Sequence, residues 1–184
     1  MKQPRIWIIT DTHFGHEKMV EYCGRPKNHS ELILENLKVI QDGDTLIHLG
    51  DVCIGDDSEW HEKFHKGMIG VTRIRLRGNH DKKSDNWYLN HGWHFVCEEM
   101  SNHYFGKYIT FSHEPIPHIQ NTNIHGHFHN NLHRLLRKEF VTPDEEARNM
   151  VALGGMNSNH KLIAIEETNY KPVLLNSLLT PLSS

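Results

Sequence analysis

Cysteine is scarce in this chain: there are 3 in 184 residues, and no two of them are separated by two residues. An odd number without paired spacing argues against a disulfide framework and predicts a reducing compartment, the cytoplasm. The sequence also lacks an apolar run long enough to cross a bilayer, and an N-terminal segment of charged and then apolar residues. We therefore expect neither a membrane span nor a secretion signal.

Net charge is also low. The chain has 20 Lys and Arg against 23 Asp and Glu, which gives −3 with histidine neutral. Such a balance provides no global field for duplex nucleic acid or an anionic membrane. The composition, 37% apolar and 23% charged, is typical of globular proteins, and the length suits one good core. We expect a single domain over residues 1–184 and leave its oligomeric state open.

Histidine, by contrast, is abundant, with 17 residues. It is the commonest metal ligand and the side chain that titrates nearest to neutrality. The alternative interpretation is a solvated, histidine-rich surface. The two interpretations differ in where the histidines should fall, because ligands are expected at strand ends beside aspartate and glycine.

Apolar runs alternate with helical patterns in the first half of the chain. The run Ile6–Ile9 fits a buried strand. Further strands are expected at 45–49, 71–74, 94–97, around 104, and at 108–111, 123–125, 150–153 and 162–165. Helices are expected at 30–40, with Ser30 as N-cap, at 60–68 and at 87–91, and residues 170–173 lead into a terminal strand or helix. This order favours an α/β architecture with two packed sheets and helices outside.

Polar side chains follow five of the strand-like segments directly. Ligands in open α/β sheets lie outside the carboxyl ends of the strands, so these clusters could meet at one rim. The clusters are Asp11 with His13, Asp51, Asn79 with His80, His113, and His127 with His129. Taken singly, Asp11 and Asp51 also fit ordinary turns after strands; only the whole set favours a metal site.

The set is rich in oxygen and imidazole donors and contains no thiolate. This argues against a closed zinc site of the cysteine type and suits Mn, Fe, Zn or Ni without choosing among them. It holds too many donors for one ion. Two ions about 3.5–4 Å apart, which need a bridging carboxylate, would use them all. Asp51 stands alone at its strand end, as a bridging residue would.

In combination, the motifs Asp11-x-His13, Gly50-Asp51, Gly78-Asn79-His80-Asp81, His113 and Gly126-His127-x-His129 resemble the calcineurin-like metallophosphoesterase family. They stand in the family's order over residues 11–129. The opening Asp-Thr-His-Phe-Gly-His and the pair Arg25-Pro26 are similar to those of a compact group from bacteria and phages. The resemblance implies a four-layer αββα sandwich, with two packed mixed sheets flanked by helices.

The resemblance also implies a role for each motif residue. One metal is expected on Asp11, His13, Asp51 and His129. The other is expected on Asp51, Asn79, His113 and His127. His80 would face the leaving group, with Asp81 keeping it oriented and charged. Manganese is the first expectation, with iron, zinc, nickel or cobalt as alternatives. One departure is that His113 is followed by Glu114-Pro115, where many small members have glycine.

The expected activity is hydrolysis of phosphate esters, with diesters preferred. Hydroxide formed between the ions would attack phosphorus in line while His80 assists the leaving group. His16, Tyr22 and Arg25 are candidate contacts to a small phosphoester or nucleotide. The alternating arginines 73, 75 and 77 are expected on one solvated sheet face.

Three alternatives stay open at this point. The chain could be a phosphomonoesterase acting on nucleotides or phosphoproteins, or a catalytically silent scaffold of the same fold. A third alternative is a nucleic-acid-binding module, for which the only basic tract is residues 133–138. That tract is short and precedes several acidic residues, and strong duplex binding is not expected.

Overall fold

The computed structural model describes residues 3–54, 57–130, 150–151 and 153–179. The basic tract at 133–138 therefore lies outside the described residues. None of the helices in the described part has the length and apolar character needed to cross a bilayer.

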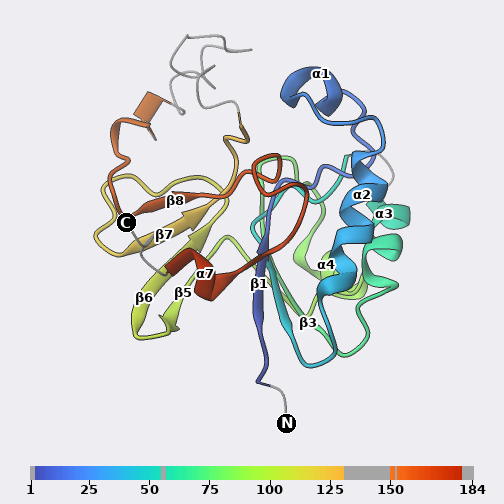
Figure 1. Ribbon diagram of the computed structural model, residues 1–184, viewed down its shortest axis with the longest axis horizontal. Coiled ribbons are helices and arrows are strands. Elements are labelled where there is room, and N and C mark those ends of the chain that lie inside the picture. The colour runs from blue at the N-terminus through green and yellow to red at the C-terminus, as the bar shows by residue number, and fades with distance from the viewer. Residues whose placement is uncertain (1–2, 55–56, 131–149, 152, 180–184) are drawn as a thin grey trace.

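A five-stranded mixed sheet forms one half of the molecule (Figure 1). Its strands are β1 (Ile6–Ile9), β2 (Thr45–His48), β3 (Thr72–Leu76), β4 (Phe95–Cys97) and β9 (Val173–Leu174), in the order β4-β3-β2-β1-β9. The first four are parallel and β9 is antiparallel to β1. Helices α2 (His29–Asn36), α3 (Asp57–His65) and α4 (Asp85–Asn90) cover its outer face, and the short α1 (Met19–Cys23) lies beyond its rim (Figure 1).

The second half is a four-stranded mixed sheet. Its strands are β5 (Glu99–Tyr104), β6 (Lys107–Ser112), β7 (Thr122–His125) and β8 (His160–Leu162), in that order. Strand β5 pairs antiparallel with β6, while β6, β7 and β8 are parallel. The short helix α7 (Leu175–Leu179) follows β9 and packs beside β1. The predicted fold class, two mixed sheets with flanking helices, is confirmed.

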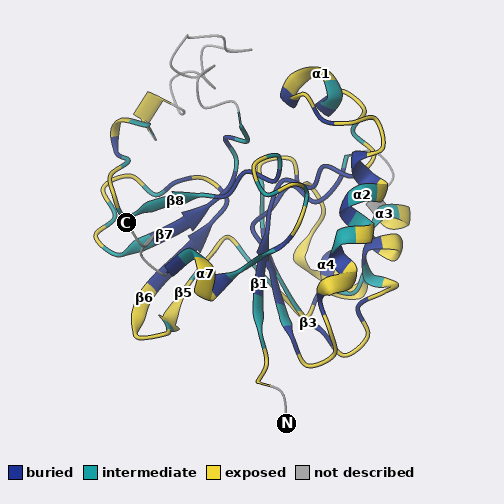
Figure 2. Ribbon diagram, in the orientation of Figure 1, coloured by how far each residue is buried: buried dark blue, intermediate teal, exposed yellow. Residues whose placement is uncertain are grey.

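Two apolar clusters hold the layers together. On β1, Trp7 and Ile9 join the cluster beneath the helices, whereas Ile8 joins the cluster that fills the space between the sheets. Successive side chains of a strand point to opposite faces, so a strand covered on both faces is apolar throughout. Figure 2 shows the central strands as the most buried part of the fold. The apolar runs therefore mark strands whose carboxyl ends are fixed from both sides.

Two late strand predictions are wrong. Met150, Val151 and Leu153 are helical, and the strand expected at 162–165 is β8 at 160–162. Short apolar runs do not distinguish a strand from a buried helix or loop by periodicity alone. Leu153 packs on Phe128, an apolar contact that a short helix can make as well as a strand.

The expectation for the arginines of β3 is also wrong at Arg75. Its guanidinium is fully buried, lies 3.5 Å from the ring centroid of Tyr88, and forms an ion pair of 2.5 Å with Asp81. Alternation does place Arg75 on one face of the strand, but Tyr88 and Trp93 close over that face. The pattern predicted the face correctly and its solvent exposure incorrectly.

A buried carboxylate sets the start of the central strands. Asp44 lies just before β2 and accepts hydrogen bonds from the backbone and guanidinium of Arg5, from the Trp7 indole and from the Gln41 backbone. These contacts fix β1 against β2. Burial opposes the charge of Asp44, but Arg5 and the other donors hold its pKa well below the ordinary value.

We predict that Asp44→Asn lowers the free energy of unfolding at pH 7 by about 1.5–3 kcal/mol, because hydrogen bonds to a charged group are replaced by weaker neutral ones. Since the native pKa is lowered, this advantage of the wild type is present above the unfolded pKa, near 3.8, and is lost as the pH falls below it. Urea denaturation at several pH values measures both effects. Asp42→Asn, at an exposed neighbour, is the control, and equal stabilities of the two variants would refute the role of Asp44.

Candidate metal centre

Five loops that follow strand ends converge at one rim of the two sheets, in the upper part of Figure 1. Strands β1, β2 and β3 are parallel within the first sheet, and β6 and β7 are parallel within the second. Backbone hydrogen bonds join the loops in pairs: Asp11 N donates to Gly50 O, His13 N to Asp51 O, and Gly126 N to His113 O. The rim therefore collects the seven predicted ligands from both sheets.

The backbone at this rim is strained. Five of the seven predicted ligands have positive φ, between 45° and 73°: Asp11, His13, Asp51, His127 and His129. Each such residue costs on the order of 1–3 kcal/mol and persists only where its surroundings hold it. Backbone strain that is concentrated at these residues indicates that the directions of their side chains are maintained at a cost in local stability.

Two glycines allow the loops to approach the carboxylates closely. A Cβ on Gly78 would lie 2.0 Å from Asp51 Oδ1, and one on Gly126 would lie 2.3 Å from Asp11 Oδ2. No side chain fits at those distances. The glycines of the Gly-Asn-His-Asp and Gly-His-Phe-His motifs are therefore required by space at the two carboxylates.

The first group of side chains comprises Asp11, His13, Asp51 and His129. Asp11 Oδ1 lies 3.8 Å from His13 Nε2 and 3.7 Å from His129 Nε2. His13 Nε2 lies 3.6 Å from Asp51 Oδ2. Donor atoms of Asp11, His13 and His129 all lie within 4.8 Å of one another, the arrangement that one ion needs.

The second group comprises Asp51, Asn79, His113 and His127. Asp51 Oδ2 lies 3.4 Å from His113 Nε2, and Asn79 Oδ1 lies 3.0 Å from the same nitrogen and 3.1 Å from His127 Nδ1. The two imidazole nitrogens are 3.2 Å apart. One oxygen of Asp51 thus faces both groups.

The chemistry of these atoms fits metal ions. His113 Nδ1 is 2.9 Å from Leu49 O; with the Nδ1 proton donated there, Nε2, which faces Asp51 and Asn79, is the nitrogen at which an ion can take the place of a proton. Asp11 Oδ1 and His13 Nε2 are buried and have no hydrogen-bond partner in the described part of the chain. Lone pairs that face one another in a buried site call for a cation. The donors are nitrogen and oxygen, as borderline and hard divalent ions prefer.

The electrostatics point the same way. Burial opposes a charge on His113, but the Asp51 and Asp11 carboxylates raise its pKa to about 10. Burial also opposes ionisation of Asp51, yet the charge and the hydrogen bond of His113 hold the pKa of Asp51 well below its usual range. Burial lowers the pKa of His13, so that this imidazole is neutral. The two carboxylates therefore draw positive charge into the cluster.

His80 and Asp81 separate in space. The exposed ring of His80 lies 5.5 Å from that of His13, and its backbone N donates to Asp51 Oδ1 at 2.9 Å. Asp81 was expected to orient His80, and this needs correction. Its buried carboxylate accepts from the backbone N of Gly78, Asp51 and Val52 and pairs with Arg75. Asp81 therefore positions the Asp51 loop, because both of its oxygens are turned inward.

The three candidate substrate contacts have different surroundings. The His16 ring lies 5.7 Å from His13 and 6.2 Å from the exposed ring of Tyr22, so both are at the rim. Arg25 is buried, and its guanidinium donates to Asp11 O, Thr12 O and Glu166. The expectation that Arg25 contacts substrate is therefore corrected: all three of its nitrogens are engaged inside the protein.

Sequence reasoning missed Glu166 altogether. Its side chain is buried, and Oε1 lies 3.2 Å from His129 Nδ1. Glu166 directly follows the apolar run 162–165. The same rule that selected Asp11 and Asp51, a polar residue after a buried run, was a usable signal here.

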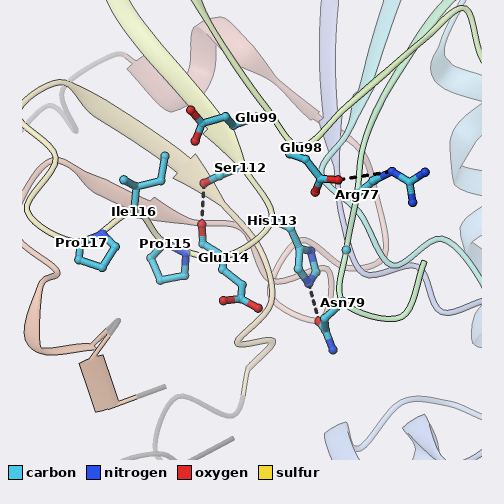
Figure 3. Close-up of a pocket in the computed structure, with 11 residues that line it drawn as sticks. Arg77, Asn79, Glu98, Glu99, Ser112, His113, Glu114, Pro115, Ile116 and Pro117 are labelled. Carbon is cyan, nitrogen blue, oxygen red and sulfur yellow. Dashed lines mark hydrogen bonds and ion pairs between the residues drawn. The ribbon is translucent and has the colours of Figure 1, made fainter. Parts of the chain in front are cut away.

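A cavity of about 410 Å³ opens beside the second group (Figure 3). Asn79 and His113 stand at one end and Pro115, Ile116 and Pro117 at the other. Arg77 forms an ion pair with Glu98 in its wall.

Comparison with known proteins gives one family. A family model described as calcineurin-like phosphoesterase matches residues 4–174. The uncharacterized protein MJ1445 of Methanocaldococcus jannaschii is 25% identical over 97% of this chain and 92% of its own length.

Solved structures show similar folds. The crystal structure of AQ665, a protein of unknown function from Aquifex aeolicus, is similar with a TM-score of 0.67 at 24% identity, covering 96% of this chain and 98% of that one. The nuclease MPE of Pseudomonas putida is a more distant match, with a TM-score of 0.47 at 21% identity over 68% of this chain and 62% of that one.

The geometry predicts that Asp51→Asn loses both ions, because a neutral amide cannot bridge two cations as a carboxylate does. The measurement is metal content by mass spectrometry after equilibration with Mn²⁺ and desalting. Asp42→Asn, which changes the same charge at an exposed site, should keep two ions per chain. Retention of two ions by folded Asp51→Asn would contradict the bridging role.

Proposed function

The chain belongs to the calcineurin-like phosphoesterase family, and from this premise we propose that it hydrolyses phosphate esters, preferring diesters, with the aid of two divalent ions. The observation that carries the proposal is the position of Asp51, whose Oδ2 lies 3.6 Å from His13 Nε2 and 3.4 Å from His113 Nε2. We propose that the first group holds one ion, that the second group holds the other, and that manganese is the native metal.

Such ions would supply the Lewis acidity that activates a water and neutralises phosphoryl oxygens. The residues of the chain supply the rest. Asp11, His13, Asp51 and His113 are buried, so water is excluded from the side of the site that faces the protein. Asp81, which pairs with Arg75, accepts a hydrogen bond from the backbone N of Asp51 and so positions the Asp51 loop. The strained loops keep the donor atoms in place before substrate arrives.

We propose His80 as the general acid. Its ring is exposed at the rim, and its backbone N is fixed to Asp51. From this position the imidazolium can give a proton to the leaving oxygen without being a ligand itself. His16, whose ring lies near those of His13 and Tyr22, and Tyr22 itself are proposed to contact the substrate.

The cavity in Figure 3 supports the preference for diesters. It opens at Asn79 and His113 of the second group, and neither His16 nor Tyr22 lines it. Its volume of about 410 Å³ accommodates a nucleoside-sized substituent that stays on phosphorus. A monoester has no such substituent. The physiological substrate is thus proposed to be a small phosphodiester handled in the cytoplasm, as the low number and unpaired spacing of the cysteines favour.

We predict that His80→Ala binds two ions and lowers kcat by about 10²–10⁴-fold for a diester with an alkyl leaving group. The loss should be smaller for p-nitrophenyl esters, because nitrophenolate leaves without needing a proton. Steady-state kinetics on both substrate types, with metal content measured in parallel, test the role. His103→Ala, at an exposed histidine of β5, is the control. Full activity of His80→Ala on the alkyl ester would refute it.

The preference itself is tested with bis-p-nitrophenyl phosphate and p-nitrophenyl phosphate. We expect the larger kcat/KM for the diester, with Mn²⁺ present. The reverse order would favour a phosphomonoesterase. No turnover with Mn²⁺, Ni²⁺, Co²⁺ or Mg²⁺, despite two bound ions, would identify a catalytically silent scaffold.

A further inference from the structure

A buried ion pair lies directly behind the first group. Arg25 Nη2 and Nε donate to Glu166 Oε1 at 2.7 Å and 2.9 Å, across 141 positions of sequence. The side chains are 0% and 4% exposed. Removing two charges from water is costly, and such a pair adds little stability over an apolar pair of the same size. Its location therefore suggests a role other than stability.

The arginine supports the loop that carries Asp11 and His13. Arg25 Nη1 donates to Thr12 O at 2.9 Å, and Nη2 donates to Asp11 O at 2.7 Å. Both carbonyls belong to the strained segment, where Asp11 and His13 have positive φ. A guanidinium with its donors fixed in one plane can bind two neighbouring carbonyls at once. It thereby holds the directions of the two side chains that flank Thr12.

The glutamate supports the third residue of the same group. Glu166 Oε1 lies 3.2 Å from His129 Nδ1, and the opposite nitrogen, Nε2, lies 3.7 Å from Asp11 Oδ1. A carboxylate that accepts the Nδ1 proton leaves the Nε2 lone pair for an ion and fixes the ring. Arg25 Nη2 is also only 3.4 Å from His129 Nδ1, so Glu166 offsets a positive charge that would oppose a cation there.

In the described part of the chain, the second group has different supports from the first. Its nearest supports are Leu49 O for His113 and the Asp81 carboxylate for the Asp51 loop. Behind Asp51 lies a different arginine, Arg75. The network of Arg25 and Glu166 is thus separate from the one behind Asp51, the residue that the two groups share.

We infer that Arg25 and Glu166 are positioning residues for the first group alone, and that they set the affinity of that ion site independently of the other. This inference rests on the proposed metal-dependent function. It predicts that a substitution at a residue that contacts neither ion weakens the binding of one of the two ions.

The test is a Mn²⁺ titration followed by electron paramagnetic resonance. Wild type should show the exchange-coupled signal of an ion pair as the second equivalent binds. Glu166→Gln, which leaves the Arg25 charge without compensation, should show the uncoupled signal of a single ion and need about 10–100-fold more Mn²⁺ for coupling. The single-ion signal of Glu166→Gln should match that of His129→Ala, which alters the first group. It should differ from that of His127→Ala, which alters the second group. Glu167→Gln, at an exposed neighbouring carboxylate, should behave as wild type.

A lone buried Arg25 can destabilise the chain, so a second variant replaces the whole pair with Arg25→Met and Glu166→Leu. This variant fills the same volume with apolar side chains and should fold. It lacks the acceptor for His129 and the donors for the Asp11 loop. The same selective loss is expected. In both variants the Mn²⁺ concentration for half-maximal activity should rise while kcat at saturating Mn²⁺ changes little.

Coupled signals equal to wild type in both variants would overturn the inference, as would equal weakening of both sites, which is the result of a general structural role. Two ions bound by wild type without hydrolysis of any ester would overturn the proposed function alone. Failure of wild type to bind Mn²⁺ would overturn both.

Discussion

The buried carboxylate of Asp51 is the constraint on which the rest of the centre depends. It is 2% exposed, and each of its oxygens has a separate task. Oδ1 accepts from His80 N in the loop after β3, whereas Oδ2 faces His13 after β1 and His113 after β6. One side chain therefore connects three loops from both sheets. A charge in such a place is tolerated only when cations or donors surround it, which is why the neighbouring loops adopt their strained shapes.

Two buried arginines stabilise this arrangement from outside the centre. Arg75 pairs with Asp81, and Asp81 in turn holds the backbone N of Asp51. Arg25 pairs with Glu166 and holds the Asp11 carbonyl. In both pairs a carboxylate offsets the charge of the guanidinium beside the candidate ligands; Arg25 Nη2 lies 3.4 Å from His129 Nδ1. The guanidinium of Arg25 donates to the strained backbone, and the carboxylates of both pairs balance positive charge that would oppose a cation.

The position of the rim could be predicted from the sequence because it depends on short, continuous segments of the chain. Parallel strands that are apolar throughout end on one edge, so Asp11, Asp51 and His113 could be expected to meet before any contact was known. The supports could not be predicted in this way. Arg75 looked exposed because alternation assigns a face and leaves open what covers it, here Tyr88. The apolar run 162–165 could have identified Glu166, but its contact with Arg25 spans 141 positions, and no short-range pattern encodes such a contact.

In the Gly-Asn-His-Asp turn, neighbouring residues have different roles. Gly78 provides the space beside Asp51, Asn79 faces His113 and His127, and His80 is exposed toward His13. Asn79 also lines the cavity, whereas His80 does not. Within the proposed mechanism the leaving group departs toward His80, which donates the proton, and the cavity holds the substituent that remains on phosphorus. Within this mechanism, Asn79 contributes to specificity for the retained group and His80 assists the leaving group, although the two residues are adjacent in one loop.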